Sequence, residues 1–494
     1  MIADKDLLSI QQARILAENA LEAQKKLASF SQEKLDRIVE SVAGAALAHA
    51  EELAALSHEE TYYGKRSDKC VKNTFVCTRV PEALRGMHCV GVLRRDAEKR
   101  IMDIGVPVGV IAAICPVTSP VSTAIYKTLI AIKSGNAIIF SPHPRAARCM
   151  TRALDIMIAA AKEAGLPEGC LSYMGTVSKS GTLELMNHKA VSLILVTGVS
   201  GLYQAARCGG KPAIYGGRGN GPAFIERTAD IDQAVRDIIA SKNFDNGIAP
   251  SAEQSVVLDA CVADAIKAAF VRQGAYFMDD EEAQKIAELF FYPDGRRKTD
   301  MVGVDAATLA RRAGIHAPDG VTLLLASRKY VSDTDPYSHG FLAPVLACYI
   351  EDDWRHACEK CIELLLFERK AHTLVIHSRD EDVIMQFALK KPVARMLVNT
   401  PAALGSMGIA TNLFPAMTLG SGSAGIGITA DNVSPMNLVY IRKVGYGVNS
   451  SPPCETSGSL PLGIDAQSLN PETREALYKI LIEAIEVIDT SSDR

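Results

Sequence analysis

A glycine-rich turn is the first segment of this chain whose residues could bind a ligand. Ser192–Val196 is a short apolar run typical of a buried strand. Thr197, Gly198 and Gly201 follow it at the start of a helical pattern. The free backbone N–H groups and the dipole at a helix start favour a pyrophosphate. A glycine turn with a purely structural role has the same pattern, so the turn alone is weak evidence for a phosphate site.

A pair of cysteines could also carry chemistry. Cys358 and Cys361 form a C-x-x-C pair inside a helical pattern, but a metal site would need two further ligands at compatible spacing, and none is apparent. The chain has 12 cysteines among 494 residues, which is typical of reduced core and surface residues. We therefore predict no metal site and a place in the core for this pair.

Charge and hydropathy exclude several classes of protein. A net charge of -4 without a lysine-rich run argues against a nucleic-acid partner, because neutralising phosphates requires a basic face. The N-terminal MIADKDLLSI is charged and lacks the apolar stretch of a secretory signal. The most apolar segment, Ile104–Val117, is short and interrupted by Gly and Pro. We expect a cytoplasmic protein with no membrane span.

The elements that must position the turn alternate between short apolar strands and helices. Apolar residues at helical spacing from Leu7 to about Leu56 indicate two or three helices that would cover a sheet. The predicted strands are Val106–Cys115, Ala137–Phe140, Ser192–Val196 and Pro222–Ile225, then Ser255–Leu258, Val321–Ala326, Val345–Ile350, Thr373–His377 and Arg395–Asn399. This alternation predicts an α/β fold with two parallel-sheet domains, 1–240 and 241–430.

The last part of the chain has a different composition. The segment 431–448 contains a predicted strand, Met436–Val448, which would add to another subunit's sheet. Residues 449–468 are rich in Ser, Pro and Gly, which predicts a flexible linker. An amphipathic helix follows at 469–491, capped by Asn470. Its apolar stripe comprises Leu477, Ile480, Leu481, Ala484, Ile485 and Ile488. A tethered helix cannot bury such a stripe alone, so we expect it to dock on its own fold or on another protein.

Six stretches form a pattern more specific than that of a generic α/β protein. They are VPVGVIAAICPVTSPVSTAIYKTLIAIKSGNAIIFSPHPRA, LILVTGVSG, AIYGGRGNGPAFIERTADI, FDNGIAPSAEQSVV, ERKAHTLVIHS and TADNVSPMNLVYIRKVGY. Together they resemble the CoA-acylating aldehyde dehydrogenases, including the aldehyde half of bifunctional aldehyde-alcohol dehydrogenases. The resemblance runs from about residue 7 to residue 447, and Ser141–Arg145 and His372–Ser378 are its most specific motifs. It implies an aldehyde dehydrogenase-like fold, with an added oligomerisation strand and a tethered C-terminal helix.

The resemblance also implies an activity, in which an aldehyde, NAD or NADP, and CoA give an acyl-CoA and the reduced cofactor. The cofactor-binding residues it implies are Ser141, His143, Arg145, Thr197, Gly198, Gly201, Gly217, Gly219 and His372. In this context nucleotide binding is favoured over a merely structural turn. For His143 and Arg145 the alternative of a structural role in the loop, with their hydrogen bonds satisfied there, stays open. Family members lack the glutamate that serves as a base in hydrolytic relatives. The glycine-rich segment Gly216–Gly219 likewise contains no glutamate. The expected acyl acceptor is therefore CoA rather than water.

The position of the family's nucleophile is where this chain departs from the pattern. The family's loop, F-D-N-G-x-x-C-x-x-E-Q, is matched from Phe244 to Gln254 except that the cysteine position is Pro250. The reaction needs a thiolate there to add to the aldehyde, expel hydride and leave a thioester. Ser251 is a weak substitute, because an unactivated hydroxyl is a poor nucleophile and no base is evident.

Further departures fall on the same reaction centre. In the family the oxyanion is held by the cysteine's own N–H, which proline lacks, and by an asparagine whose position is Ser119 here. The glutamate that contacts the nicotinamide ribose is replaced by Gly340, and a tryptophan by Ala424. Cys115 lies near the Ser119 turn, but a buried strand cysteine is the favoured interpretation.

Three functions remain open at this point. The favoured one is a catalytically degenerate family member with a structural, regulatory or binding role. It would be a homo-oligomer whose terminal helix docks on shell or cargo proteins of a bacterial microcompartment. The alternatives are an active acylating oxidoreductase with an unrecognised nucleophile, and a protein that binds acyl-CoA or aldehyde without redox chemistry.

Overall fold

The computed structural model describes residues 4–448 and 468–491, so most of the predicted linker 449–468 lies outside the described residues. The chain divides into two compact units, Met1–Arg94 with Asp103–Lys443, and Arg95–Met102 with Val444–Arg494. No described helix combines the length and the apolar composition that a membrane span requires.

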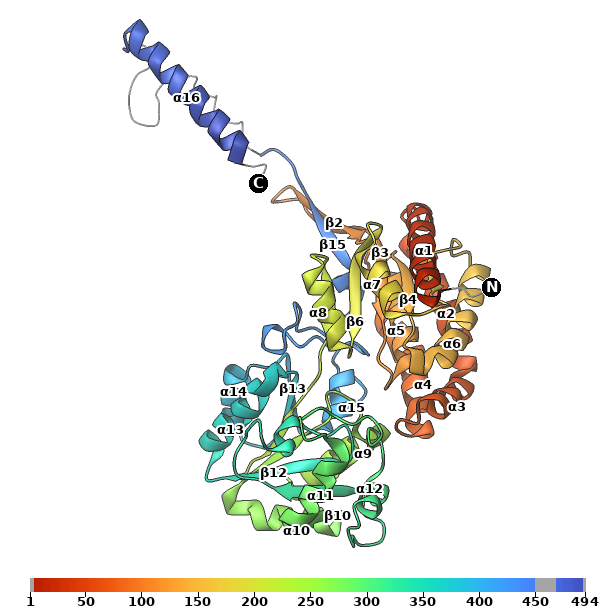
Figure 1. Ribbon diagram of the computed structural model, residues 1–494, viewed down its shortest axis with the longest axis vertical. Helices are drawn as coiled ribbons and strands as arrows, with labels where there is room; N and C mark the ends of the chain where they lie inside the picture. Colours follow the sequence, from red (N-terminus) through yellow and green to blue (C-terminus); the bar gives the residue numbers. More distant parts are fainter. Residues whose placement is uncertain (1–3, 449–467, 492–494) are drawn as a thin grey trace. The chain divides into compact units, whose positions relative to one another are not determined.

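A five-stranded parallel sheet forms the first half of the larger unit (Figure 1), in the order β5-β4-β3-β6-β7. Its strands are β3 (Val110–Ile114), β4 (Ala137–Ser141), β5 (Leu171–Tyr173), β6 (Val191–Thr197) and β7 (Ala213–Gly216). Every residue of β3 and β4 is buried. Parallel strands covered on both faces need continuous apolar runs rather than alternation, which is what these segments contain.

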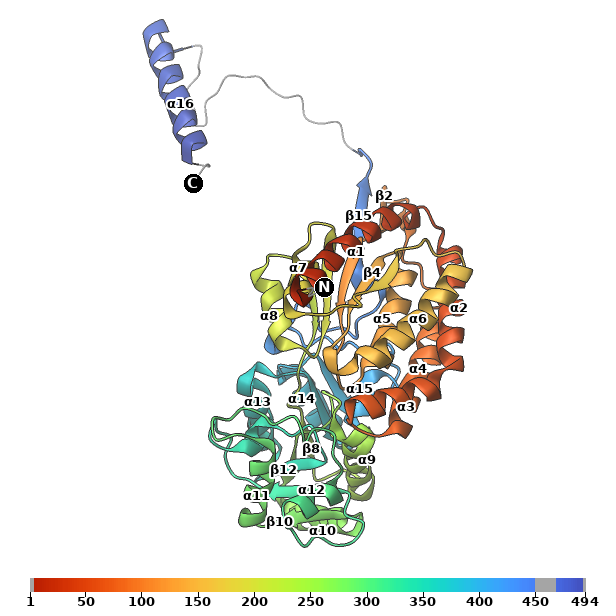
Figure 2. The same ribbon diagram turned by 45° about the vertical axis from the view of Figure 1, so that its right-hand side comes forward.

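Eight helices accompany this sheet within the described residues. They are α1 (Lys5–Leu27), α2 (Gln32–Ala48), α3 (Ala50–Thr61), α4 (Arg66–Leu84), α5 (Pro120–Lys133), α6 (Ala147–Glu163), α7 (Lys179–Asn187) and α8 (Ser200–Cys208). Helix α1 lies across α7 and β4 (Figure 2). It buries an alanine face (Ala13, Ala17, Ala20 and Ala23), while Leu21 is exposed. Leu27 at the end of α1 is also buried, so an apolar face is present and consists mainly of small side chains where α1 approaches α7 and β4.

The second parallel sheet has seven strands in the order β10-β11-β12-β9-β8-β13-β14. They are β8 (Pro222–Ile225), β9 (Ser255–Asp259), β10 (Ala275–Met278), β11 (Leu323–Ser327), β12 (Val345–Glu351), β13 (Thr373–His377) and β14 (Arg395–Val398). The helices of this part are α9 (Ile231–Asn243), α10 (Ala263–Arg272), α11 (Asp280–Phe290), α12 (Ala306–Arg312), α13 (Trp354–Leu366), α14 (Glu381–Lys390) and α15 (Ala402–Met407). Two parallel sheets confirm the predicted α/β class.

Strand pairing shows that the chain passes from the first sheet to the second before residue 240, the predicted boundary. Strand β8 pairs with β9 and β13, so it belongs to the second sheet although it precedes that boundary. The chain returns to the first half after α15, where Leu419 and Val433 pack in the first core. Pairing therefore assigns β8 to the second sheet, and packing assigns Leu419 and Val433 to the first core, while the domain bounds 1–240 and 241–430 remain predictions.

The remaining strands form a three-stranded sheet in the order β1-β2-β15. They are β1 (Gly91–Asp96), β2 (Ile101–Pro107) and β15 (Val439–Gly445). The last helix, α16 (Pro471–Ser491), begins where the Asn470 side chain accepts a hydrogen bond from the Thr473 N–H at 2.9 Å. Ile480 and Leu481 on α16 are exposed. That β15 serves oligomerisation remains a prediction.

Candidate active site

A cavity of about 430 Å³ lies between the two parallel sheets of the larger unit. From the first sheet it is lined by residues that end or follow strands, such as Thr197 at the end of β6 and Gly216 at the end of β7. From the second sheet it is lined by residues that precede strands, such as Gly219 before β8 and His372 before β13. Ligands of parallel α/β proteins bind outside the carboxyl ends of strands, so the first sheet supplies the ligand-binding edge.

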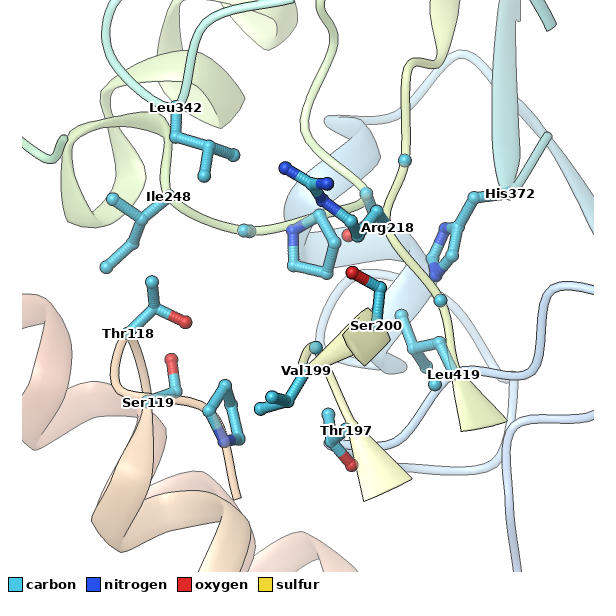
Figure 3. Close-up of a pocket in the computed structure, with 18 of the residues that line it drawn as sticks. Thr118, Ser119, Thr197, Val199, Ser200, Arg218, Ile248, Leu342, His372 and Leu419 are labelled. Carbon is cyan, nitrogen blue, oxygen red and sulfur yellow. The ribbon is translucent and has the colours of Figure 1, made fainter. Parts of the chain in front are cut away.

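The predicted nucleotide turn lines this cavity. Thr197, Gly198 and Gly201 are all among its lining residues, and Figure 3 shows Thr197 and Ser200 on one of its walls. Gly198 has φ +76°, a conformation that favours glycine, and the Thr197 hydroxyl is 2.8 Å from that of Thr418. No side chain caps the start of α8. Its first N–H groups therefore remain available to an anionic ligand.

The motif Ser141–Arg145, at the end of β4, is only partly brought to the cavity. His143 lines it, and burial and the neighbouring Arg145 lower the pKa of the imidazole. Ser141 lines an adjoining cavity that shares His143 with the first, and its hydroxyl is 2.8 Å from that of Thr182. Arg145 lines neither cavity, because its guanidinium donates to the Tyr63 hydroxyl at 2.9 Å.

The loop before Pro250 has a strained backbone. Asp245 and Asn246 have φ of 48° and 53°, in the left-handed region that non-glycine residues rarely adopt. Such strain persists only where the surroundings hold it in place. The Asp245 carboxylate, fully buried, accepts a hydrogen bond from the Lys65 N–H at 2.7 Å. Gly64 is required beside it, because a Cβ there would lie 1.9 Å from an Asp245 oxygen.

Two buried lysines of α4 complete this anchor. The Lys69 ammonium lies 3.4 Å from the Asp245 carboxylate, and the Lys72 ammonium also bonds that carboxylate. Burial opposes ionisation of Asp245, but the two ammonium groups hold its pKa below the usual range. Sequence reasoning missed this cluster. Its signal is a pair of lysines three residues apart in a helix, which places both on one face.

The two expected oxyanion positions and the neighbouring serine lie in the same cavity. Pro250, Ser119 and Ser251 all line it. The Ser119 hydroxyl accepts a hydrogen bond from the Lys72 ammonium at 2.7 Å. The Ser251 hydroxyl is buried and has no hydrogen-bond partner in the described part of the chain. Gly219 packs against the loop so closely that a Cβ there would meet the Pro250 carbonyl oxygen at 1.9 Å.

The residues after Pro250 hold the loop in place through hydrogen bonds. The Glu253 carboxylate accepts a hydrogen bond from the Ala402 N–H at 3.0 Å, and the Gln254 amide oxygen accepts one from the Lys242 ammonium at 3.0 Å. Burial raises the pKa of Glu253 to about 7 and lowers that of Lys242 to about 7. These contacts fix the loop, and Gln254 itself lines the cavity.

Gly217 and His372, the remaining expected cofactor residues, also line the cavity. His372 is buried, and its Nδ1 lies 2.8 Å from the Thr373 hydroxyl. Burial and then the Arg395 charge lower the pKa of this imidazole well below its usual range, so His372 is neutral. Its Nε2 has no hydrogen-bond partner among the described residues.

Three cations that line the cavity were not found from the sequence. Arg218, Arg297 and Lys370 line it, from segments that precede β8, follow α11 and precede β13. Burial and then Arg218 lower the pKa of Arg297 to about 10. Burial, Arg218 and Arg297 lower that of Lys370 to about 7. No local pattern could have grouped residues so far apart in the chain.

No cysteine is among the described residues that line the cavity. Cys115 lines the adjoining cavity, and burial raises the pKa of its thiol to about 11, which disfavours a thiolate. Cys208 and Cys261 are exposed and line neither cavity. Cys358 and Cys361 are buried in the core of the second half, and no group of metal-ligating side chains occurs in the described parts of the chain.

Known proteins with similar sequences include several acylating enzymes. The bifunctional aldehyde-alcohol dehydrogenase of Escherichia coli is 36% identical over 441 residues, which cover 88% of this chain and 49% of that protein. This chain spans about half the length of the first curated relatives it matches. The succinate-semialdehyde dehydrogenase (acetylating) of Clostridium kluyveri is 31% identical over 431 residues, covering 87% of this chain and 95% of that protein.

Solved structures are also similar. A probable aldehyde dehydrogenase from Listeria monocytogenes is 45% identical with a TM-score of 0.89, covering 91% of this chain and 99% of that one. An acetylating aldehyde dehydrogenase from Geobacillus thermoglucosidasius is 41% identical with a TM-score of 0.88, covering 91% and 100%. A propionaldehyde dehydrogenase from the fucose utilisation microcompartment of Clostridium phytofermentans is 28% identical with a TM-score of 0.79, covering 87% and 96%.

The model of the aldehyde dehydrogenase family matches residues 2–283, more than half of the 494 residues. The order of the sheets, the cavity between them and the similarity to acylating enzymes along most of the chain agree with that match. This chain therefore belongs to the aldehyde dehydrogenase family.

Proposed function

We propose that this chain is a catalytically disabled acylating aldehyde dehydrogenase that retains a ligand-binding cleft. The observation that carries the proposal is the cavity lining, which contains Pro250 at the expected nucleophile position and no cysteine among the described residues. Without a thiolate, the aldehyde carbonyl has no group that could form a hemithioacetal and then a thioester. Hydride transfer to a nicotinamide would have no covalent intermediate to start from.

The surroundings of Pro250 support the same proposal. Proline has no N–H, so it cannot donate to a developing oxyanion. The Ser119 hydroxyl accepts a hydrogen bond from Lys72 and has a single proton to donate, on a side chain shorter than the family's asparagine. Losing one oxyanion donor costs about 3–4 kcal/mol of transition-state stabilisation, and the loss of the thiolate comes in addition. Restoring the nucleophile alone would therefore restore only part of the rate.

The part of the cavity at the glycine turn is suited to hold a cofactor, whereas the part at Pro250 is not suited to catalysis. Thr197, Gly198 and Gly201 line the cavity, and the uncapped start of α8 offers N–H groups to a pyrophosphate. NAD or NADP, when bound, would supply hydride chemistry, and CoA would supply the acyl acceptor. In this chain the turn would orient such a ligand, and Pro250 would leave it unreacted. This is a binding or regulatory role within an oxidoreductase family.

An assay of the full chain tests the proposal. Short aldehydes, CoA and NAD+ or NADP+ are incubated with the natural protein and with Pro250→Cys, and absorbance of the reduced cofactor is followed. We expect no cofactor reduction by the natural chain and a measurable gain for Pro250→Cys. Robust turnover by the natural chain would refute the proposal.

An active enzyme with another nucleophile is the second candidate, and one observation favours it. The Ser251 hydroxyl is buried, unpartnered within the described residues, and lines the cavity. No hydrogen bond joins it to a base there, and Cys115 faces the adjoining cavity instead. If the natural chain turns over and Ser251→Ala abolishes that activity, this candidate replaces the first.

The terminal helix supports a docking role. Helix α16 carries exposed Ile480 and Leu481, and the similar propionaldehyde dehydrogenase comes from a bacterial microcompartment. We infer that this helix docks a cytoplasmic homo-oligomer on shell or cargo proteins, as amphipathic helices dock in apolar grooves. Deleting residues 469–494 should preserve folding and abolish co-purification with such proteins. A truncated chain that still co-purifies would disprove the docking role.

A further inference from the structure

A buried lysine of the second half has its ammonium group against a thiol. Lys391, just after α14, and Cys358, in α13, are 8% and 5% exposed. The Lys391 Nζ lies 2.5 Å from the Cys358 Sγ and donates a hydrogen bond to the Cys358 carbonyl oxygen at 2.8 Å. It also lies over the Phe387 ring, 4.0 Å from the centroid. Neither Lys391 nor Cys358 lines either cavity, so their contact lies outside the candidate active site.

The charge of this ammonium is poorly compensated. Both of its hydrogen-bond acceptors are atoms of Cys358, and no carboxylate pairs with it in the described parts of the chain. Sulfur is only a weak acceptor, and a buried charge without a counter-charge is costly. A reaction that leaves the Lys391 nitrogen uncharged would remove this cost.

The separation of nitrogen and sulfur is intermediate between that of a hydrogen bond and that of a direct bond. An N–H···O hydrogen bond spans about 2.7–3.2 Å and sulfur is larger than oxygen, so 2.5 Å is too short for an ammonium–thiol hydrogen bond. A bond between two sulfur atoms spans about 2.05 Å and nitrogen is smaller than sulfur, so 2.5 Å is too long for a direct N–S bond. Two atoms that are both bonded to one oxygen have a separation of this kind.

We propose that Cys358 and Lys391 form an oxidative cross-link in which one oxygen atom bridges Sγ and Nζ. Hydrogen peroxide first oxidises the Cys358 thiol to a sulfenic acid and is reduced to water. The Lys391 ammonium gives a proton to solvent. A second peroxide then takes the sulfenic O–H hydrogen and one amine hydrogen, the O–N bond forms, and this peroxide is reduced to two waters. The S–O–N–H product carries no charge.

Cys361, one helical turn further along α13, offers a competing product, a disulfide with Cys358. It is fully buried, and burial raises the pKa of its thiol to about 12, which disfavours the thiolate that would attack a sulfenic acid. Cys358 and Lys391 keep a small exposed fraction, so a molecule as small as peroxide can reach them. Lys391 is therefore the favoured partner of Cys358.

The cross-link would join α13 to the end of α14. Its two residues are 33 positions apart, so the bond would close a long loop and restrict the unfolded chain. The segment after Lys391 leads into β14, which the link would fasten to α13 under oxidising conditions. This inference does not depend on the proposed loss of catalysis.

Mass spectrometry of the full chain tests the cross-link. The chain is purified with dithiothreitol, freed of it, treated with hydrogen peroxide and digested for tandem mass spectra. We expect a species that has gained one oxygen atom and lost two hydrogen atoms, in which the peptides of Cys358 and Lys391 are joined. Excess dithiothreitol should separate them, because two of its molecules supply the four hydrogen atoms that restore thiol, amine and water.

Variants identify the joined atoms. Lys391→Met and Cys358→Ser should each abolish the joined peptides. Lys390→Met, at the exposed neighbouring lysine, and Cys361→Ser should retain them. Circular dichroism confirms that each variant folds, and Lys391→Arg replaces Lys391→Met if that variant does not, because a guanidinium cannot become the neutral amine that the reaction needs.

Three results would overturn the inference. Peroxide could leave the two peptides of the natural chain unjoined, with Cys358 unchanged or carried on to the sulfinic acid. Cys358 could instead form a disulfide with Cys361, which loses two hydrogen atoms and gains no oxygen. The joined species could also persist in Lys391→Met, which would place the bridge on another residue.

Discussion

Cations lie on both walls of the central cavity, but only those on the α4 wall are buried together with a carboxylate. On the α4 wall, Lys69 and Lys72 pair with Asp245, whose side chain is fully buried. On the opposite wall, Arg218 is exposed, whereas Arg297 and Lys370 are half-buried. A carboxylate buried with its cations holds a loop in one place, whereas a long cationic side chain with access to solvent can move to meet a ligand. The first wall is therefore architectural, and the second is the more adaptable.

The largest expected effect comes from breaking the paired wall. Asp245→Ala leaves two buried ammonium groups without a counterion and releases the loop that presents Pro250. We expect a loss of about 3–5 kcal/mol in the free energy of unfolding, measured by urea denaturation. Asp294→Ala, which breaks the exposed pair with Arg296, should leave stability unchanged. Equal stability of Asp245→Ala and the natural chain would show that the cluster does not hold the loop.

A smaller effect is expected from pH at the opposite wall. The pKa of Lys370 is lowered to about 7, so its ammonium is lost as pH rises through that value and regained as pH falls. Arg297, with a pKa of about 10, stays charged, and His372 stays neutral. The pyrophosphate of NAD+ keeps its charge in this range, so the affinity for NAD+, measured by calorimetric titration, should rise from about pH 8 to about pH 6. Lys370→Met should flatten that profile, and an unchanged slope would show that Lys370 does not face the bound nucleotide.

Local patterns in the chain were enough to predict the class of fold and the place of the loop. The strands of both sheets are continuous apolar runs, and the F-D-N-G segment leads to Pro250 whatever the packing around it. The pattern was less informative where small and large apolar residues compete, as in α1, where alanines are buried and Leu21 is exposed. A periodic pattern shows that a helix has an apolar face, but the spacing to its neighbour decides which side chains fit.

The sequence by itself determined the family, the glycine turn and the proline at the expected nucleophile position, because each is set by residues adjacent in the chain. Only the tertiary structure decided that Arg145 turns away to Tyr63, and that Lys72 reaches Ser119. It alone also brought Arg218, Arg297 and Lys370 to one cavity. Their proximity follows from the pairing order of the second sheet, which is a long-range property. Electrostatic interactions depend on distance in space, and separation along the chain does not reveal it.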